Sequence, residues 1–198
     1  MKTRNLTLII IVAAVLLLGG CGCGSYNTMN AQKQQVGESW SNVENQYKRR
    51  TDLIGNLVNT VKGAANFEQE TLTQVINARA KATQVTIDPS NITPEKMQQF
   101  QAAQGEVSGA LSRLLVTVER YPELKATQNF QNLQVELSST ENKIATERSR
   151  FNEVARNYNT TVTKFPNVLY AGVLGFKERP YFAATEAEQK TPNVDFSK

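Results

Sequence analysis

Apolar residues recur at alternating steps of three and four through most of the chain. The first series begins at Val36 and ends near Gly63. This spacing places its members on one face and predicts an amphipathic helix that packs against a core. Arg50 is the only charged residue in the series. The members are Val36, Trp40, Val43, Tyr47, Arg50, Ile54, Leu57, Val61 and Ala64.

A second helix is predicted from about Phe67 to Gln84, followed by the turn segment "TIDPSNITPEK". Pro89 in this segment stops the second helix. Thr93 is the expected N-cap of the next helix, because Pro94 suits the first helical position and Glu95 the first turn. The apolar face of the second helix is marked by Leu72, Val75, Ile76, Ala78, Arg79 and Ala82.

Two further series predict a third helix and a longer fourth one. The third breaks at Pro122, because the residue before a proline avoids the helical region. The fourth is predicted as one helix from about Glu123 to Lys164. The third series consists of Met97, Phe100, Gln104, Val107, Leu111, Leu114, Val118 and Tyr121. The fourth consists of Phe130, Leu133, Leu137, Thr140, Ile144, Glu147, Phe151, Val154 and Tyr158.

Together these segments predict an all-α protein, because no stretch alternates in the manner of a strand. Short connections between long amphipathic helices favour antiparallel neighbours. We therefore expect an antiparallel up-down helical bundle of about four long helices over residues 25–182. A membrane anchor at residues 1–24 precedes it, and a loose C-terminal tail at residues 183–198 follows it.

The N-terminus has the pattern of a membrane signal. Lys2 and Arg4 precede the uncharged apolar run Leu6 to Gly20, which is the order of a basic and an apolar region in such signals. As a helix this run is about 22 Å long, which is short for a bilayer core of about 30 Å. However, the next charge is Lys33, so a longer helix could span the membrane.

Cys21 offers a different mode of anchoring. The segment "LGGC", Leu18 to Cys21, resembles a bacterial lipobox, in which the cysteine becomes lipidated. Cys21 is therefore the lipidation candidate of a lipoprotein, and a single-pass transmembrane helix is the alternative. Both interpretations leave Lys2 and Arg4 in the cytoplasm and place the helical domain outside it.

The composition argues against most kinds of nucleic-acid, metal-binding and catalytic site. The net charge of +4 is mild and acids are interspersed with bases along most of the chain, so we expect no nucleic acid partner. The chain has no histidine, and its two cysteines, Cys21 and Cys23, lie near the N-terminus. The helical domain therefore lacks soft metal ligands and a thiol nucleophile, and we expect neither metal nor cofactor. No nucleotide-binding, zinc-protease or serine-hydrolase motif occurs, which favours a protein that is not an enzyme.

Arg50 requires a partner if its helix buries it, because an unpaired charge is costly in a core. If the first and fourth helices are antiparallel neighbours, counting along both places Glu141 near the level of Arg50. We therefore predict a buried Arg50–Glu141 pair, with Asn142 or Glu136 taking remaining donors. The alternative is that Arg50 extends its head into water along the helix surface.

The segment "YAGVLGF", Tyr170 to Phe176, also has two interpretations. It can pack back onto the end of the bundle, or it can contact the membrane or a partner. The aromatic residues Phe165, Tyr170 and Phe176 are the candidates for such a contact, because an up-down bundle brings the end of the fourth helix to the membrane end. Lys164, Lys177 and Arg179 accompany them.

The chain resembles the LemA family of bacterial envelope proteins. The resemblance rests on "SYN" after the anchor and on "WSNVENQYKRRTDLIGNLVNTVKG", "LSRLLVTVERYPELKATQNFQNLQVELSSTENKIA", "RFNEVARNYN" and "GFKERPYF", which cover most of residues 25–182. Gly55 stands where the family pattern usually has proline, so the first helix can pass this point without a kink. The resemblance implies one N-terminal membrane segment, an all-α domain and a location in the bacterial cell envelope.

The resemblance also implies a role beside other envelope proteins, with a membrane protease system as one candidate partner. We therefore expect a non-catalytic scaffold or modulator of envelope proteins. One alternative is a hydrolase with an unrecognised serine–lysine or carboxylate site, which would require those groups to meet in a cleft. The other is an oligomeric structural rod, which would leave a wide apolar stripe on the surface.

Overall fold

The computed structural model describes the backbone of residues 2–63 and 67–183, and within these ranges the side chains from Gly24 onward. This part of the chain forms helices and no strand, so the predicted all-α class is confirmed. The helices are α1 (Lys2–Lys62), α2 (Gln69–Gln84), α3 (Pro94–Val118), α4 (Pro122–Lys125), α5 (Gln128–Thr163) and α6 (Val168–Ala171).

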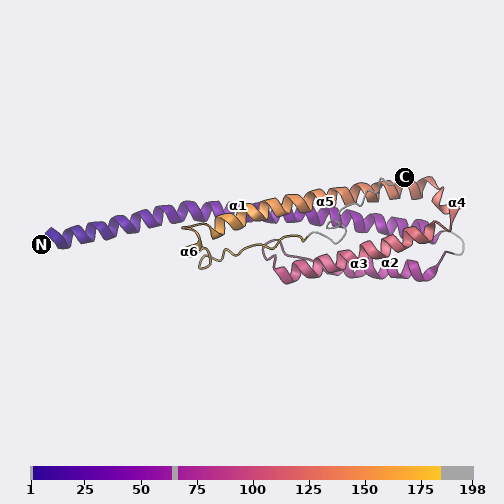
Figure 1. Ribbon diagram of the computed structural model, residues 1–198, viewed down its shortest axis with the longest axis horizontal. Coiled ribbons are helices and arrows are strands. Elements are labelled where there is room, and N and C mark those ends of the chain that lie inside the picture. Colours follow the sequence, from indigo (N-terminus) through magenta and orange to yellow (C-terminus); the bar gives the residue numbers. More distant parts are fainter. Residues whose placement is uncertain (1, 64–66, 184–198) are drawn as a thin grey trace, which may run out of the picture.

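The long helices lie side by side along one axis (Figure 1). α1 packs mainly against α5, α2 packs against α3, and α1 also contacts α2. Each long helix starts at the end where the previous one finished, so consecutive helices run in opposite directions (Figure 1). The predicted start of α3 is found: Oγ1 of Thr93 accepts a hydrogen bond from the Lys96 amide at 3.4 Å, and Pro94 is the first helical residue.

The predicted fourth helix is interrupted, and this is a correction. The chain forms the short helix α4, leaves the helical conformation at Thr127 with ψ of 136°, and restarts as α5. Thr127 Oγ1 donates a hydrogen bond to the Leu124 carbonyl at 2.7 Å. Such side-chain bonds give the backbone an alternative to the helix. The break lets Leu124, which is 6% exposed, join the core.

The core consists of two apolar clusters that follow each other along the helices. One contains Trp40, Phe100 and Phe151, and the other contains Leu57, Leu114 and Leu137 among others. Along α1 the change from one cluster to the other falls at Arg50, between Tyr47 and Leu53. On α3 it falls at Gln104, and on α5 between Leu137 and Ile144. A polar layer therefore separates the two halves of the core.

The C-terminal strap, residues 176–183, completes the cluster that contains Trp40. No residue of α2 belongs to this cluster, because α2 ends at Gln84 and covers only the other half of the core. Phe176 and Phe182 of the strap take part instead. The Phe182 ring stacks on Trp40 with centroids 5.8 Å apart and an interplanar angle of 12°. An extended segment thus replaces the length that α2 lacks.

The N-terminal part of α1 continues beyond the other helices as a single helix (Figure 1). Within the residues whose side chains are described, no helix is both long and apolar enough to cross a membrane. The predicted anchor at residues 1–24 lies outside that part except for Gly24, and so does the side chain of Cys21. The tail predicted to be loose also lies outside the described residues, apart from Ala183.

Candidate functional site

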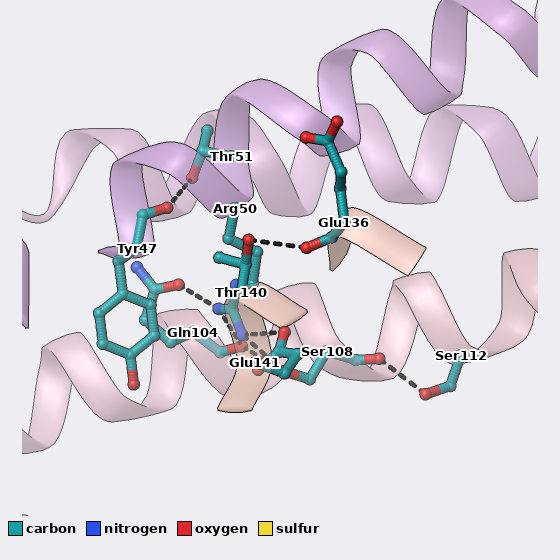
Figure 2. Close-up of polar contacts among 9 residues, drawn as sticks. All are labelled: Tyr47, Arg50, Thr51, Gln104, Ser108, Ser112, Glu136, Thr140 and Glu141. Carbon is teal, nitrogen blue, oxygen red and sulfur yellow. Dashed lines mark hydrogen bonds and ion pairs between the residues drawn. The ribbon is translucent and has the colours of Figure 1, made fainter. Parts of the chain in front are cut away.

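Arg50 lies at the centre of the polar layer and is 2% exposed. Its Nη1 donates to Glu141 Oε1 at 2.9 Å and to Ser108 Oγ at 3.2 Å. Its Nη2 donates to the main-chain carbonyl of Gln104 at 3.3 Å and to the side-chain oxygen of the same residue. Figure 2 shows that the guanidinium of α1 reaches both α3 and α5. The structure therefore brings Arg50 and Glu141 together.

Arg50 and Glu141 differ in their exposure to water. The side chain of Arg50 is 3% exposed, whereas that of Glu141 is 43% exposed. The Tyr47 ring lies beside the guanidinium, with its centroid 4.9 Å from Arg50 Cζ, and adds a cation–π contact. Water thus reaches the carboxylate but not the arginine, and this weakens the ion pair relative to a fully buried one.

The prediction that Asn142 or Glu136 of α5 takes remaining donors of Arg50 is wrong. Glu136 lies 3.6 Å from Arg49 instead, and both side chains are more than half exposed. Glu136 precedes Glu141 by five residues, which at 3.6 residues per turn rotates it well away from the face that Arg50 approaches. Asn142 is exposed. The other hydrogen bonds of the two Nη atoms go to Gln104 and Ser108 of α3, whereas the buried Nε has no hydrogen-bond partner within the described residues.

Gln104 could have been identified as a partner from the sequence. It is a polar member of an otherwise apolar series, as Arg50 is. Two buried polar residues in one core are expected to meet, because each needs hydrogen bonds. Ser108 lies one helical turn further on the same face, and its hydroxyl donates to the Gln104 carbonyl at 3.1 Å. Both residues were missed because the prediction considered partners on the fourth predicted helix alone.

An open cleft of about 230 Å³ borders the polar layer. Arg50, Glu141 and Ser108 lie in its wall with Arg148. The Ser108 hydroxyl donates its proton to a main-chain carbonyl rather than to a base, so its environment does not activate it as a nucleophile. Within the described ranges, no three Asp, Glu, His or Cys side chains come together to hold a metal ion. The arrangement suits structural pairing of three helices.

Two asparagines of α5 fix the strap by its backbone. Asn159 accepts a hydrogen bond from the Arg179 amide at 2.7 Å and donates to the Arg179 carbonyl at 2.8 Å. Asn152 does the same for Phe182, at 2.8 Å and 3.0 Å. The two asparagines are seven residues apart, which is two turns, and so share one face of α5. Neither asparagine was predicted as a binding residue, although both lie in "RFNEVARNYN" at this spacing.

The Arg179 side chain extends this contact to the α2–α3 connection. Its Nη2 donates to the Ser90 carbonyl at 2.9 Å and its Nη1 to the Ile92 carbonyl at 3.4 Å. Tyr158 lies fully buried in the same region. Burial raises the pKa of the Tyr158 phenol above its ordinary value, so this group stays neutral at physiological pH. The strap thus joins α5 to the start of α3.

The three aromatic contact candidates do not form one surface. Phe165 is 73% exposed, and Tyr170 is half-buried with its hydroxyl donating to Asn167 Oδ1 at 2.7 Å. Phe176 is only 5% exposed, and its ring centroid lies 5.4 Å from that of Tyr26 on α1. The assignment of Phe176 to a membrane or partner contact is therefore corrected, because its ring is part of the core.

Comparison with known proteins places these features in a family. The model of the LemA family matches residues 39–196, which include the polar layer and the strap. The chain belongs to the LemA family. Its "WSNVENQYKRR" and "STENKIA" segments carry Arg50 and Glu141, and "GFKERPYF" carries the strap residues that the α5 asparagines bind.

Individual relatives are similar at low identity. Magnetosome proteins MamQ 2 and MamQ 1 of Paramagnetospirillum magneticum are each 27% identical over 174 residues, which covers 79% of this chain and 64% of theirs. Protein LemA of Metamycoplasma hominis is 25% identical over 166 residues, covering 84% of this chain and 72% of its own. The chain thus spans 64% of the length of the MamQ relatives.

Proposed function

We propose that this LemA-family protein is a non-catalytic helical module of the bacterial cell envelope. In this proposal the N-terminal part of α1 holds an up-down helical bundle at a membrane, and the bundle scaffolds or modulates other envelope proteins. The observation that carries the proposal is the continuity of α1. One helix joins the charge-free N-terminal run to the buried seam of the bundle.

The relatives support an association with membranous structures of the cell. The MamQ proteins are named as magnetosome proteins, and LemA gives its name to the family. The polar layer supports a structural role rather than catalysis, because Arg50 is engaged by Glu141, Gln104 and Ser108. The proposed module therefore acts through its surface and its position at the membrane.

Fractionation of cells that express the full chain tests the anchoring. We expect the chain to sediment with membranes and to resist extraction by alkaline carbonate. A variant that lacks residues 6–20 is expected to appear in the soluble fraction with an unchanged helical circular dichroism spectrum. Full extraction of the unaltered chain by carbonate would refute the proposed anchoring.

Cys21 decides between the two modes of anchoring. In a lipoprotein, Cys21→Ala abolishes labelling by a fatty-acid probe and leaves a slower-migrating precursor, whereas Cys23→Ala, the matched control, does neither. In a single-pass protein, neither change alters migration and no label appears in any form. Crosslinking in intact cells followed by mass spectrometry then identifies the envelope proteins in contact with the bundle, with the variant lacking residues 6–20 as the control for location.

A further inference from the structure

The connection after α5 exposes an unusual number of large apolar side chains. We call them the apolar foot. They are Phe165, Val168, Leu169, Val173 and Leu174, which are 73%, 51%, 70%, 90% and 45% exposed. These five exposed side chains lie within ten consecutive residues, and large exposed apolar patches mark interaction sites.

The foot is held in a defined conformation. Gly175 has φ of +79°, which favours glycine, and the Phe176 amide bonds the Ala171 carbonyl at 2.9 Å across this turn. This is the pattern of a helix end closed by a Schellman motif. The Asn167 side chain donates to the Thr161 carbonyl of α5 at 2.9 Å and so ties the foot to the bundle. The apolar side chains are therefore directed outward by ordered structure.

The position of the foot relates it to the N-terminal apolar run. Phe176, directly after the foot, packs on Tyr26 of α1. Tyr26 follows the end of the run at Gly20 by six residues, which is about 9 Å along a helix. The polar zone on each side of a bilayer core is about 5–8 Å thick. If the run is in the bilayer or Cys21 is lipidated, the Phe176–Tyr26 contact lies at the outer edge of this polar zone, and the adjoining foot is within reach of the membrane interface.

The charges around the foot fit an anionic lipid surface. Between the exposed acids Glu153 and Glu178 the chain has no acidic residue. The exposed cations Arg156, Lys164 and Lys177 lie in this stretch. Cations beside exposed apolar residues are typical of segments that lie in a membrane interface. A second copy of the chain fits less well, because a stable protein interface buries about 800 Å² per partner, and the foot is confined to ten consecutive residues.

We propose that the apolar foot inserts into the headgroup and acyl boundary of the same membrane that holds the N-terminus. This inference rests on the proposed membrane anchoring and assigns a second contact to it. Two contacts, one through the start of α1 and one through the foot, fix the tilt of the bundle relative to the membrane, whereas a single helix leaves the tilt free.

The test uses Val173→Trp in the full chain, reconstituted in vesicles of phosphatidylcholine and phosphatidylglycerol. Val116→Trp on α3 is the matched control, because Val116 is also a largely exposed valine, 72%. The native Trp40 is buried and lies about 30 Å from Gly20 along α1, so its emission gives a constant background. Leu169→Trp is a second probe if Val173→Trp fails to fold by circular dichroism.

We expect the emission added by Val173→Trp to shift to the blue in vesicles and to be quenched by lipids brominated near the headgroup end of their acyl chains. The emission added by Val116→Trp is expected to remain red and unquenched. If the chain floats with the vesicles but the foot probes are not quenched, the foot proposal is wrong and the anchoring stands.

Two other outcomes also overturn the proposal. A blue shift without bromine quenching that grows with protein concentration would assign the foot to contact between copies of the chain. Failure of the unaltered chain to float with vesicles would reject both the anchoring and the foot. Flotation thus separates the failure of the proposed function from the failure of this inference.

Discussion

Arg50 shows how one side chain can join three helices. It is a charge on an apolar seam, and burial of such a charge is costly unless an opposite charge and hydrogen bonds compensate it. Glu141 supplies the opposite charge from α5, while Gln104 and Ser108 supply acceptors from α3. Because these partners must stand at one level, the layer favours one register of otherwise similar apolar seams, a role that buried polar residues have in coiled coils.

A double-mutant cycle of Arg50→Met and Glu141→Gln measures this pairing. We expect Arg50→Met to lower the free energy of unfolding by about 2–3 kcal/mol, because the buried side chain of Gln104 loses its donor. Glu141→Gln should cost about 1 kcal/mol, because the carboxylate is partly hydrated and glutamine retains an acceptor. The expected coupling energy is about 1 kcal/mol by urea unfolding.

The exposed pair Arg49 and Glu136 is the matched control for this cycle. Arg49→Met and Glu136→Gln should give coupling near zero, because both side chains are more than half exposed. Additive effects in the Arg50 cycle, equal to those of the control, would contradict a contact between Arg50 and Glu141.

Substitution by alanine is expected to change the stability in opposite directions at two glycines. Gly105 lies within α3, and an added Cβ would meet no atom within 4 Å. Gly105→Ala should therefore stabilise the protein by about 0.5–1 kcal/mol, because alanine restricts the unfolded chain and favours the helix. Gly175→Ala should destabilise it by about 1–2 kcal/mol, because φ is +79° there. Thermal unfolding of both variants checks the signs, and a gain in stability for Gly175→Ala would contradict the turn described after the foot.

Among the elements, helix α2 is too short to cover the whole core. It covers the cluster around Leu57 and ends before the cluster around Trp40. The strap covers this second cluster, and two asparagines of α5 bind its main chain. An extended segment needs such partners, because it has no hydrogen bonds of its own. The strap is thus a structural element of the bundle, although it contains no helix.

Asn159→Ala tests the strap. The expected cost is about 1–3 kcal/mol in unfolding free energy, because the Arg179 amide and carbonyl lose their partners in a buried site. Hydrogen exchange should become faster at the amides of Arg179 and Phe182. Asn157→Ala, at an exposed position of the same helix, is the control and should leave exchange in the strap unchanged. Equal exchange in the two variants would contradict the clamp.

The connection between α2 and α3 should weaken in acid. Hydrogen bonds from the Ser90 hydroxyl and amide to Asp88, at 2.7 Å and 2.8 Å, lower the Asp88 pKa below its ordinary value of 3.8. Two hydrogen bonds to the Glu95 carboxylate lower its pKa below the ordinary value of 4.5. The larger effect comes from the main-chain amide of Glu95 and the smaller from the Thr93 side chain. Because both pKa values are lowered by folding, their stabilisation is present above these ordinary values and is lost as pH falls through the lower folded values.

Thermal unfolding between pH 6 and pH 3 measures this effect. The melting temperature should fall below about pH 4, where the unfolded carboxylates begin to bind protons. The double variant Asp88→Asn and Glu95→Gln should show a shallower dependence over the same range, because it removes the two groups. An identical slope in the variant and the unaltered protein would contradict the contribution of this connection.

For the whole molecule, the polar layer, the strap and the foot divide the length of the bundle into parts with different tasks. One half of the core is closed by α2 and the other by the strap. The foot and the N-terminal extension of α1 lie at the same end of the bundle (Figure 1). The proposed membrane contacts are therefore together at one end, away from the far end of the long helices.

Chelation should not affect the stability of this molecule. The chain contains no histidine and no cysteine after Cys23, so soft ligands for a structural zinc ion are lacking throughout the bundle. We expect the melting temperature of the full chain to be the same with and without EDTA. A fall of several degrees on chelation, reversed by added zinc or calcium, would show that a metal contributes to folding.

The sequence by itself determined the long helices and most of their buried faces, but not the break at Thr127 that separates α4 from α5. The seam residues of α1 from Val36 to Val61 are buried, and α3 begins at the predicted proline. These features depend on the period of the helix and on local turn chemistry, both of which are carried by neighbouring residues. The meeting of Arg50 and Glu141 could also be predicted by counting residues along the two helices, because the rise per residue is constant.

Only the tertiary structure decided at what level α3 meets Arg50 and where the strap lies. Gln104 is a polar member of its seam in the sequence, but its level beside Arg50, and that of Ser108, depend on how α3 lies along α1, which the period of one helix does not specify. The strap is bound through the main chain of Arg179 and Phe182, and every residue except proline carries the same amide and carbonyl groups. The burial of Phe176 follows from that path, because its ring packs on Tyr26 of α1, whereas Phe165 precedes the strap and is exposed.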